Sequence, residues 1–155
     1  MTENLPYKIA NLTDLSSEQQ QDVASTVADY TTNVGHKEYK MLALSYEEVR
    51  NRMGQVAFVG GKIAGYVGAS GPEEGPHGNM SEVGSLFVLE KYQQRGIAKG
   101  LLKAAINNLS EKEIVPYIFC NDNSLPAAKA VGFEPTETSE VPACATDACS
   151  GCVAM

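Results

Sequence analysis

Long apolar runs, basic side chains and cysteines are all scarce in this 155-residue chain. No run of about 18 apolar residues occurs, which excludes a membrane-spanning helix. Twelve Lys and Arg residues face nineteen Asp and Glu residues, and a net charge of −7 argues against a nucleic-acid binder. Residues 1–6 include Glu3 and no apolar stretch, so we expect no secretory signal and a cytoplasmic protein.

The remaining composition is that of a folded protein. Apolar residues make up 43% of the chain and charged residues 20%, as is typical of one soluble domain that buries its own core. Without a secretory signal, the cysteines are expected to be reduced thiols rather than a disulfide framework. They are Cys120, Cys144, Cys149 and Cys152.

The hydrophobic pattern alternates between strands and helices. Strands are expected at residues 7–12, 55–59, 63–69, 82–89 and 114–120, and helices at 16–30, 45–53, 97–109 and 124–131. Gly60-Gly61 predicts a tight hairpin, residues 71–79 predict a loop, and Gly132 predicts a helix end. One apolar face of the third helix is formed by Ile97, Leu101, Leu102, Ala105 and Leu109.

Residues 82–98 form the segment that most clearly suggests a ligand-binding function. A strand is followed by a turn with Gly96 and then by a helix, whose first four amides have no intrahelical partner and attract a phosphate. Without a Cβ, Gly96 lets a diphosphate approach the backbone closely. Residues 91–103 carry four basic side chains and no acidic one, so they can attract an anionic ligand locally. An ordinary turn with a solvated basic face remains the alternative.

The same segment resembles a known family. Residues 88–102, with Gln-x-x-Gly-x-Ala at 93–98, resemble motif A of the GNAT (Gcn5-related) N-acetyltransferases. A second landmark, motif B, is resembled by Asn121, Ser124, Gly132 and Phe133. The resemblance covers residues 7–135 and implies an α/β fold, with a mixed sheet splayed between its fourth and fifth strands and helices on both faces. Acetyl-CoA would lie in the splay as the acyl donor.

The resemblance also implies the donor-binding residues. Backbone amides from Gln94 to Lys99 would hold the pyrophosphate, the strand end at residues 86–88 would pair with the pantetheine arm, and Asn121 would contact the donor from the next strand. The whole expected set is Leu86, Phe87, Val88, Gln93, Gln94, Arg95, Gly96, Ile97, Ala98, Lys99 and Asn121.

Acetyl transfer to an amine requires an unprotonated nucleophile and a polarised thioester carbonyl. We choose Glu82 as the catalytic base, because it begins the strand leading to Val88 and, at a period of two, shares that residue's face. In the family a Glu here often acts as base through water, and the amide of Val88 would hold the carbonyl oxygen. The alternative role of Glu82 is an exposed residue at a strand end.

The proton donor for the leaving thiolate departs from the family pattern. Many members have a Tyr seven residues after the Asn, where this chain has Ala128. Tyr117 or Cys120 could substitute, packing is the alternative role of each, and solvent can protonate the thiolate itself. His36 in a predicted acceptor-site loop and His77 in the Gly/Pro-rich loop are each a catalytic candidate or an ordinary surface residue.

We divide the chain into a GNAT domain at residues 1–135 and an acidic, cysteine-containing tail at 136–155 that packs on or completes the same domain. Cys144, Cys149 and Cys152 can belong to a flexible reduced tail, to a metal site one ligand short of tetrahedral, or to a redox pair. Some bacterial family members end in similar tails, which leaves the role open, and we assign no metal site.

The sequence therefore predicts an acetyl-CoA-dependent N-acetyltransferase that acts by direct attack in a ternary complex. A small amine or amino-acid-like acceptor is favoured over a protein. The alternatives are a non-catalytic acyl-CoA-binding regulatory module, a protein N-terminal or lysine acetyltransferase, and a regulator that uses the thiols of the tail. We expect neither nucleic acid nor membrane as a partner and leave a homodimer open.

Overall fold

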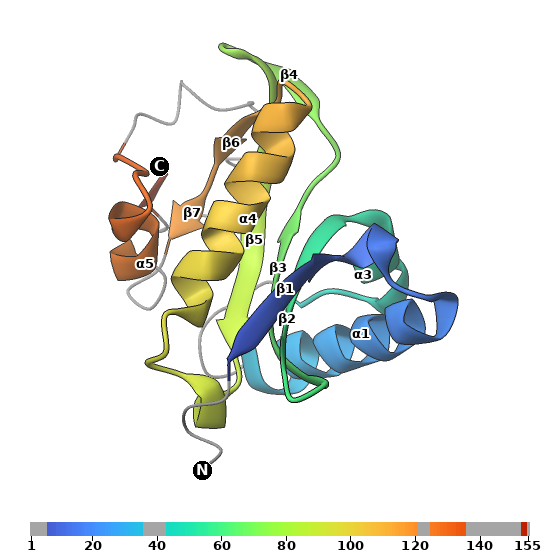
Figure 1. The fold of residues 1–155 in the computed structure, drawn as a ribbon. Helices are drawn as coiled ribbons and strands as arrows, with labels where there is room; N and C mark the ends of the chain where they lie inside the picture. Colours follow the sequence, from blue (N-terminus) through green and yellow to red (C-terminus); the bar gives the residue numbers. More distant parts are fainter. Residues whose placement is uncertain (1–5, 36–42, 121–124, 136–152, 155) are drawn as a thin grey trace.

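The computed structural model describes residues 6–35, 43–120, 125–135 and 153–154 (Figure 1). A mixed sheet lies between two layers of helices. Its antiparallel strands run in the order β1 (Tyr7–Asn11), β2 (Met53–Val59), β3 (Lys62–Ala69), β5 (Gly78–Val88) and β4 (Glu73–Gly75), and β6 (Val115–Tyr117) pairs with β5 in parallel. The α/β fold expected from the sequence is confirmed.

Helices cover both faces of this sheet. One face carries α4 (Ile97–Glu111) and α5 (Leu125–Ala130), and the other carries α1 (Ser17–Tyr30) and α3 (Tyr46–Asn51), as Figure 1 shows. Shorter helical turns are η2 (Leu12–Asp14), η3 (Thr31–Gly35) and η4 (Glu90–Tyr92), and a second sheet pairs β7 (Phe119–Cys120) with β8 (Val153–Ala154). No helix within the described residues is both long and apolar enough to cross a bilayer.

Two capping boxes define where α1 and α3 begin. Ser16 accepts a hydrogen bond from the Gln19 amide, and the Gln19 side chain accepts one from the Ser16 amide. Ser45 and Glu48 make the same reciprocal pair before α3. Each box satisfies two amides that the helix leaves without an intrahelical partner, so these starts follow from local sequence. The second helix ends at Asn51, slightly before the predicted end.

The predicted hairpin at Gly60-Gly61 is confirmed, since both glycines have positive φ angles (58° and 79°), as tight hairpin turns require. Two expectations were wrong. The predicted loop at residues 71–79 contains a short hairpin between β4 and the start of β5, and the predicted strand at 114–120 is divided into β6 and β7. Strand length and pairing are decided by neighbouring strands, which local composition does not reveal.

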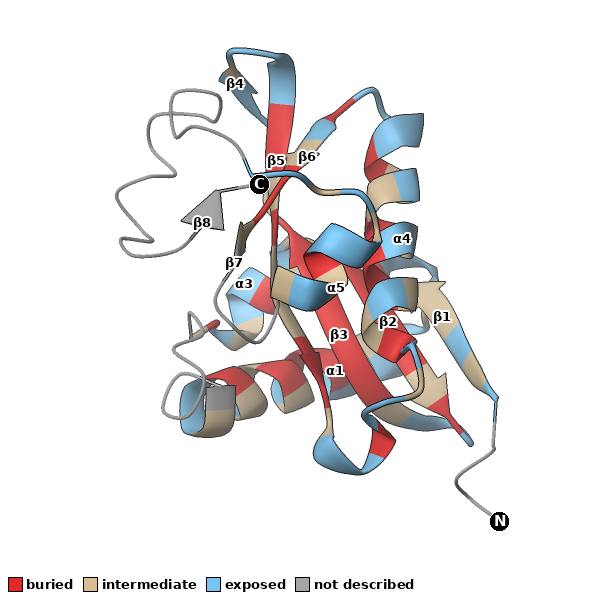
Figure 2. Ribbon diagram, turned by 90° about the vertical axis from the view of Figure 1, so that its left-hand side faces the viewer, coloured by how far each residue is buried: buried red, intermediate tan, exposed pale blue. Residues whose placement is uncertain are grey.

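Most of the core lies in two apolar layers, one on each face of the sheet (Figure 2), and a small third cluster contains Met80 and Tyr117. On one side, the predicted apolar face of α4 is confirmed, because Ile97, Leu101, Leu102, Ala105 and Leu109 are all buried against the strands. On the other side, Val23 and Val27 of α1 pack with Tyr66 and Phe87 of the sheet. At about 25 cal/mol per Å² of apolar surface, these layers supply the main stabilisation of the fold.

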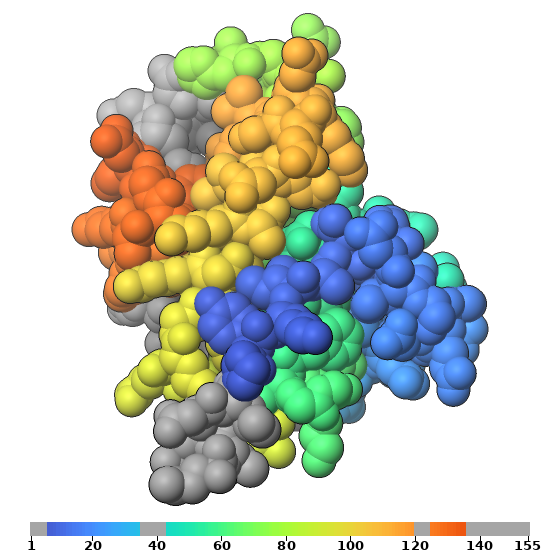
Figure 3. Space-filling model, in the orientation of Figure 1, coloured from blue at the N-terminus to red at the C-terminus, as the bar shows by residue number. Residues whose placement is uncertain are grey.

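Strand β1 lies against the start of α4, and the two elements are exposed on the same face of the molecule (Figure 3). A Cβ added to Gly100 would lie 2.8 Å from the Tyr7 hydroxyl and 3.1 Å from Ile9 Cδ1, so glycine permits this close approach. The Tyr7 hydroxyl donates a hydrogen bond to the Gly96 carbonyl (3.4 Å). The first strand thereby supports the helix start that the sequence singled out.

Candidate active site at the open edge of strand β5

Strand β5 is paired along only part of its second edge. Its parallel pairing with β6 joins residues 80–82 to residues 115–117 and ends at Glu82 and Tyr117. The next strand along the chain, β7, pairs with β8 instead. Within the described part of the chain, the edge of β5 after Glu82 is therefore not paired with another strand. The predicted splay between the fourth and fifth main strands is confirmed.

A β-bulge interrupts β5 at the start of this open edge. Gly84 is opposite Gly68 and Phe87 is opposite Tyr66, so β5 uses one residue more than β3 over the same distance. Ser85, in the bulge, has a positive φ of 57°, which is unusual for a residue with a side chain. The extra residue reverses the alternation of side chains beyond it.

The bulge makes one expectation about Glu82 wrong. Val83 and Val88 both pack in the layer beneath α4, whereas the Glu82 carboxylate lies beside Gly84 on the α1 and α3 side. Glu82 and Val88 therefore occupy opposite faces of β5, and Glu82 lies within the strand rather than at its start. A period of two holds only for an uninterrupted strand.

The backbone of Val88 points toward the open edge. The Leu89 amide donates to the Ala64 carbonyl of β3 (2.8 Å), and because amides alternate along an antiparallel strand, the Val88 amide faces away from β3. The Val88 carbonyl accepts a hydrogen bond from the Gln93 side chain (3.0 Å) on that side. Gln93 thus ties the strand end to the turn that leads into α4.

The start of α4 presents its amides as the sequence predicted. Gly96 is the N-cap residue with a left-handed φ of 79°, and no side chain caps the helix. The Gly100 amide is the first to bond back into the helix, to the Gly96 carbonyl (3.0 Å), so the amides of Ile97, Ala98 and Lys99 precede the intrahelical ladder. A Cβ added to Gly96 would meet nothing within 4 Å, which leaves room for a ligand.

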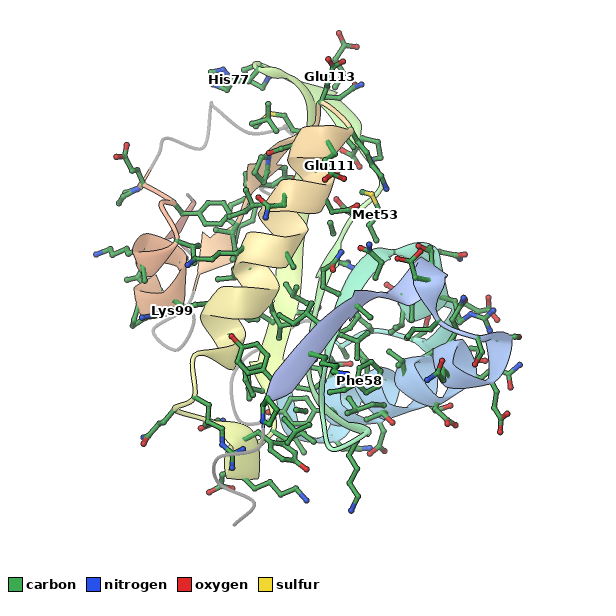
Figure 4. The ribbon with its side chains drawn as sticks, in the orientation of Figure 1. Met53, Phe58, His77, Lys99, Glu111 and Glu113 are labelled. Atoms are coloured by element: carbon green, nitrogen blue, oxygen red, sulfur yellow. The ribbon has the colours of Figure 1, made fainter. Side chains whose placement is uncertain are left out.

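Basic side chains surround this helix start. Lys91 and Arg95 both lie over the ring of the buried Tyr92, with charge-to-centroid distances of 5.1 and 5.6 Å. Lys99 is exposed on the outer side of α4 (Figure 4). Their positive charges add to the attraction of the helix amides for an anion.

Several of the expected donor-binding residues have side chains that are packed into the protein. The Phe87 ring is buried and stacks on Tyr30 of α1 (centroids 4.0 Å apart), and Ile97 is fully buried in the core. Leu86 and Ala98 are partly buried against the same core, and Gln94 has a positive φ of 64° in the turn. Asn121 lies outside the described residues.

Glu82 is held firmly. Its amide donates to Ser70 Oγ and its carbonyl accepts from the Ser70 amide, both at 3.0 Å, while its other edge is in register with Tyr117. Burial raises the pKa of the Glu82 carboxyl above its ordinary value, the positive charge of Arg52 lowers it, and Glu73 raises it further. A half-buried carboxyl with a raised pKa is suited to proton transfer near neutral pH.

Sequence reasoning missed the neighbours of Glu82. Gly54, Gly68 and Gly84 are aligned across three adjacent strands and form what we call the glycine row. Tyr66 and Arg52 lie close to where Cβ atoms on these glycines would be. A Cβ added to Gly68 would lie 2.5 Å from Tyr66 Oη and 2.8 Å from Arg52 Nε. The missed signal is a glycine in each of three strands, which only the strand register connects.

No strong proton donor for a leaving group emerges among the described side chains. Ala128, within α5, is fully buried in the core, and Tyr117 packs edge-on against Phe119 with centroids 5.9 Å apart. Cys120 ends β7, and His77 is exposed at the β4–β5 turn, near the opposite end of α4 from Lys99 (Figure 4). His36 and the cysteines of the tail lie outside the described residues.

No cluster of three or more His, Cys, Asp or Glu residues that could hold a metal is found in the described ranges. Cys144, Cys149 and Cys152 lie outside these ranges.

Fold and site together define an α/β protein of the acyltransferase class, with a splayed sheet and an amide-rich helix start. The Acetyltransferase (GNAT) family model matches residues 16–133 of the chain. This protein therefore belongs to the GNAT acetyltransferase family, as the resemblance of residues 88–102 indicated. No match by sequence is found among the curated proteins.

Solved structures share the fold. N-acetylglutamate synthase from Neisseria gonorrhoeae, complexed with coenzyme A and N-acetyl-glutamate, superimposes with a TM-score of 0.73 at 14% identity over 96% of this chain and 34% of that one. A predicted acetyltransferase from Clostridium acetobutylicum, with acetyl-CoA, has a TM-score of 0.60 at 14% identity over 86% and 92% of the two chains. Glucosamine-6-phosphate N-acetyltransferase from Arabidopsis thaliana has a TM-score of 0.61 at 12% identity over 85% of this chain and 94% of that one.

Proposed function

We propose that this protein transfers an acetyl group from acetyl-CoA to an amine, by direct attack in a ternary complex. The observation that carries the proposal is the open edge of β5 beside the uncapped start of α4. A pantetheine arm contains amide groups that can pair with an open strand edge, and a diphosphate suits amides at a helix start. Two structural neighbours are described with acetyl-CoA or coenzyme A, which supports this donor.

Each part of the donor has a place in this proposal. The backbone of Leu86, Phe87 and Val88 pairs with the pantetheine arm, and amides from Gln94 to Lys99 hold the diphosphate. The thioester carbonyl oxygen accepts a hydrogen bond from the Val88 amide, which faces the open edge. Such a donor stabilises the negative charge that develops on the oxygen in the transition state.

The reaction then needs one base. The amine nitrogen attacks the thioester carbon, a C–N bond forms, the C–S bond breaks, and the sulfur leaves as a thiolate. Glu82 accepts the proton that the amine loses, directly or through water, and its raised pKa suits that role. Solvent protonates the thiolate, since Ala128 occupies the position where many family members carry a Tyr.

A non-catalytic acyl-CoA-binding module is the second candidate, and the buried Ala128 is the observation that favours it. Two structural neighbours are named as enzymes, an N-acetylglutamate synthase and a glucosamine-6-phosphate N-acetyltransferase, which favours the catalytic candidate. Release of coenzyme A from acetyl-CoA, measured against a panel of amines, separates the two candidates. Turnover with at least one amine is expected, whereas acetyl-CoA binding without turnover on any of them would establish the binding module.

The tail at residues 136–155 is proposed to complete the same domain, which the pairing of Val153–Ala154 with β7 supports. A metal-linked role of its cysteines is tested by metal analysis of the purified protein. Less than one zinc per several chains would dismiss that role.

A further inference from the structure

The surface beside Glu82 has a feature that general acetyl transfer does not require. The residues of the glycine row have no side chains of their own on the α1 and α3 side. Tyr66 covers Gly54 and Gly68, and two charged groups of opposite sign approach Gly84. Arg52 lies between α3 and β2, and Glu82 lies in β5.

Both charged groups converge on one point. The position of a Cβ on Gly84 would lie 3.4 Å from Glu82 Oε2 and 3.7 Å from Arg52 Nη2. A negative and a positive group are therefore close enough to contact the two ends of a single small molecule. A side chain at Gly84 would fill the space between them, and glycine leaves it available.

The polar groups here also lie close to one another. Arg52 Nε and the hydroxyl of the fully buried Tyr66 both face Gly68. Burial raises the pKa of Tyr66, and the charge of Arg52 and a side-chain hydrogen bond to it lower that pKa. With Nε beside Tyr66, the guanidinium presents Nη2 toward Gly84. The terminal nitrogens of a guanidinium bind a carboxylate in bidentate fashion.

We propose that Arg52 binds a carboxylate of the acceptor and that the acceptor is an amino acid, whose amine then lies beside Glu82. An α-amino acid carries its amine and its carboxylate on one carbon atom, which matches the opposite charges converging over Gly84. It has no net charge when zwitterionic, so the acidic protein does not repel it. Protein lysines and most protein N-termini lack a neighbouring carboxylate and are disfavoured. This inference rests on the proposed acetyltransferase function.

The test is a panel of matched acceptors with acetyl-CoA as donor. Each amino acid is compared with its amide and with the amine formed by removing its carboxyl group, and coenzyme A release is measured. For the wild type we expect a kcat/KM about 10- to 100-fold higher for the best amino acid than for its amide, as hydrogen bonds to a charged group imply. Arg52→Gln should abolish this preference through the KM of the amino acid, whereas the effect of losing the charge beside Glu82 applies to the amino acid and the amide alike.

Two further variants make the result specific. Arg52→Lys keeps the charge without the bidentate edge and should restore only part of the preference. Arg50→Gln is the matched control, because Arg50 is close in sequence but donates to the Tyr46 hydroxyl (3.1 Å), and it should keep the full preference. Acetyl-CoA affinity and thermal unfolding confirm that each variant is folded. If a variant is not folded, the comparison of amino acids with their amides in the wild type still tests the inference.

Three results would overturn the inference. They are a wild type that treats amino acids and their amides alike, an equal loss with all acceptors in Arg52→Gln, and a peptide with an acidic N-terminal residue that exceeds every free amino acid. In each case acetyl transfer still occurs, so the proposed function stands. Transfer to no amine at all would overturn the proposed function together with this inference.

Discussion

Glu82 and Val88 lie on opposite faces of β5, although their positions in the chain differ by an even number. The bulge at Ser85 is the cause, because it adds one residue to β5 opposite β3. As a result, the carboxylate faces the α1 side while the Val88 amide still faces the open edge. The proposed base and the proposed oxyanion contact thereby come from one strand.

The bulge can be tested at Ser85, whose φ of 57° is in the left-handed region. Ser85→Gly should stabilise the protein or leave it unchanged, within about 1 kcal/mol, since glycine adopts this conformation without strain. Ser85→Val should destabilise it by about 1–2 kcal/mol and lower turnover, since a β-branched residue resists a positive φ. Urea unfolding and coenzyme A release provide the measurements, and equal stability of the two variants would contradict the role of the bulge.

Removing the carboxylate in Glu82→Gln should lower turnover by about 100-fold or more and leave acetyl-CoA affinity nearly unchanged. Wild-type kcat/KM should rise with pH through a pKa above the ordinary glutamate value, because only the deprotonated carboxylate accepts a proton. That limb of the profile should disappear in the variant. Glu74→Gln, at an exposed position on β4, is the control and should retain the wild-type profile.

The same raised pKa predicts an effect on stability. A carboxyl whose pKa is higher in the folded than in the unfolded state binds more protons when folded, so it loses stabilising free energy as the pH rises between the two pKa values. Glu82→Gln should therefore be more stable than the wild type at neutral pH, with a smaller difference at pH 4. Thermal unfolding at several pH values measures this, and a less stable variant at neutral pH would contradict the burial effect.

Gly96 and Gly61 allow a matched test of the diphosphate site. Both have a φ of 79° and open space where a Cβ would be, so a side chain causes similar backbone strain at each. Gly96→Glu should weaken acetyl-CoA binding by about 5- to 1000-fold, because like charges 4 Å apart repel by about 1–4 kcal/mol in solvent-exposed sites. Gly61→Glu should leave it unchanged. Calorimetry measures the acetyl-CoA affinity of both variants. Equal affinities would show that the donor does not bind at the start of α4.

The packing of β3 against β5 depends on Gly65. A Cβ there would lie 2.7 Å from the Phe87 carbonyl oxygen, and backbone cannot move aside as a flexible side chain can. Gly65→Ala should destabilise the protein by about 1–3 kcal/mol. Gly71→Ala, where a Cβ meets nothing within 4 Å, should change stability by no more than about 0.5 kcal/mol. Denaturant unfolding gives the free energy of unfolding of each variant. A Gly65→Ala variant as stable as the wild type would show that β3 and β5 can move apart to accommodate the methyl group.

By itself, the sequence determined the features that depend on residues close together in the chain. The helix starts near Ser16 and Ser45, the Gly60-Gly61 turn and the apolar face of α4 were each predicted, because a few neighbouring residues specify a turn or a helix. The Gln-x-x-Gly-x-Ala segment at 93–98 belongs with them, since a left-handed glycine before a helix is a local feature.

Only the tertiary structure decided which face Glu82 occupies and which residues surround it. A single-residue bulge reverses every side chain beyond it, and its position follows from how β5 pairs with β3. Arg52, Tyr66 and Glu82 meet because Gly54, Gly68 and Gly84 are in register across three strands. Strand register is set by the packing of the whole sheet, so no short stretch of the chain contains it.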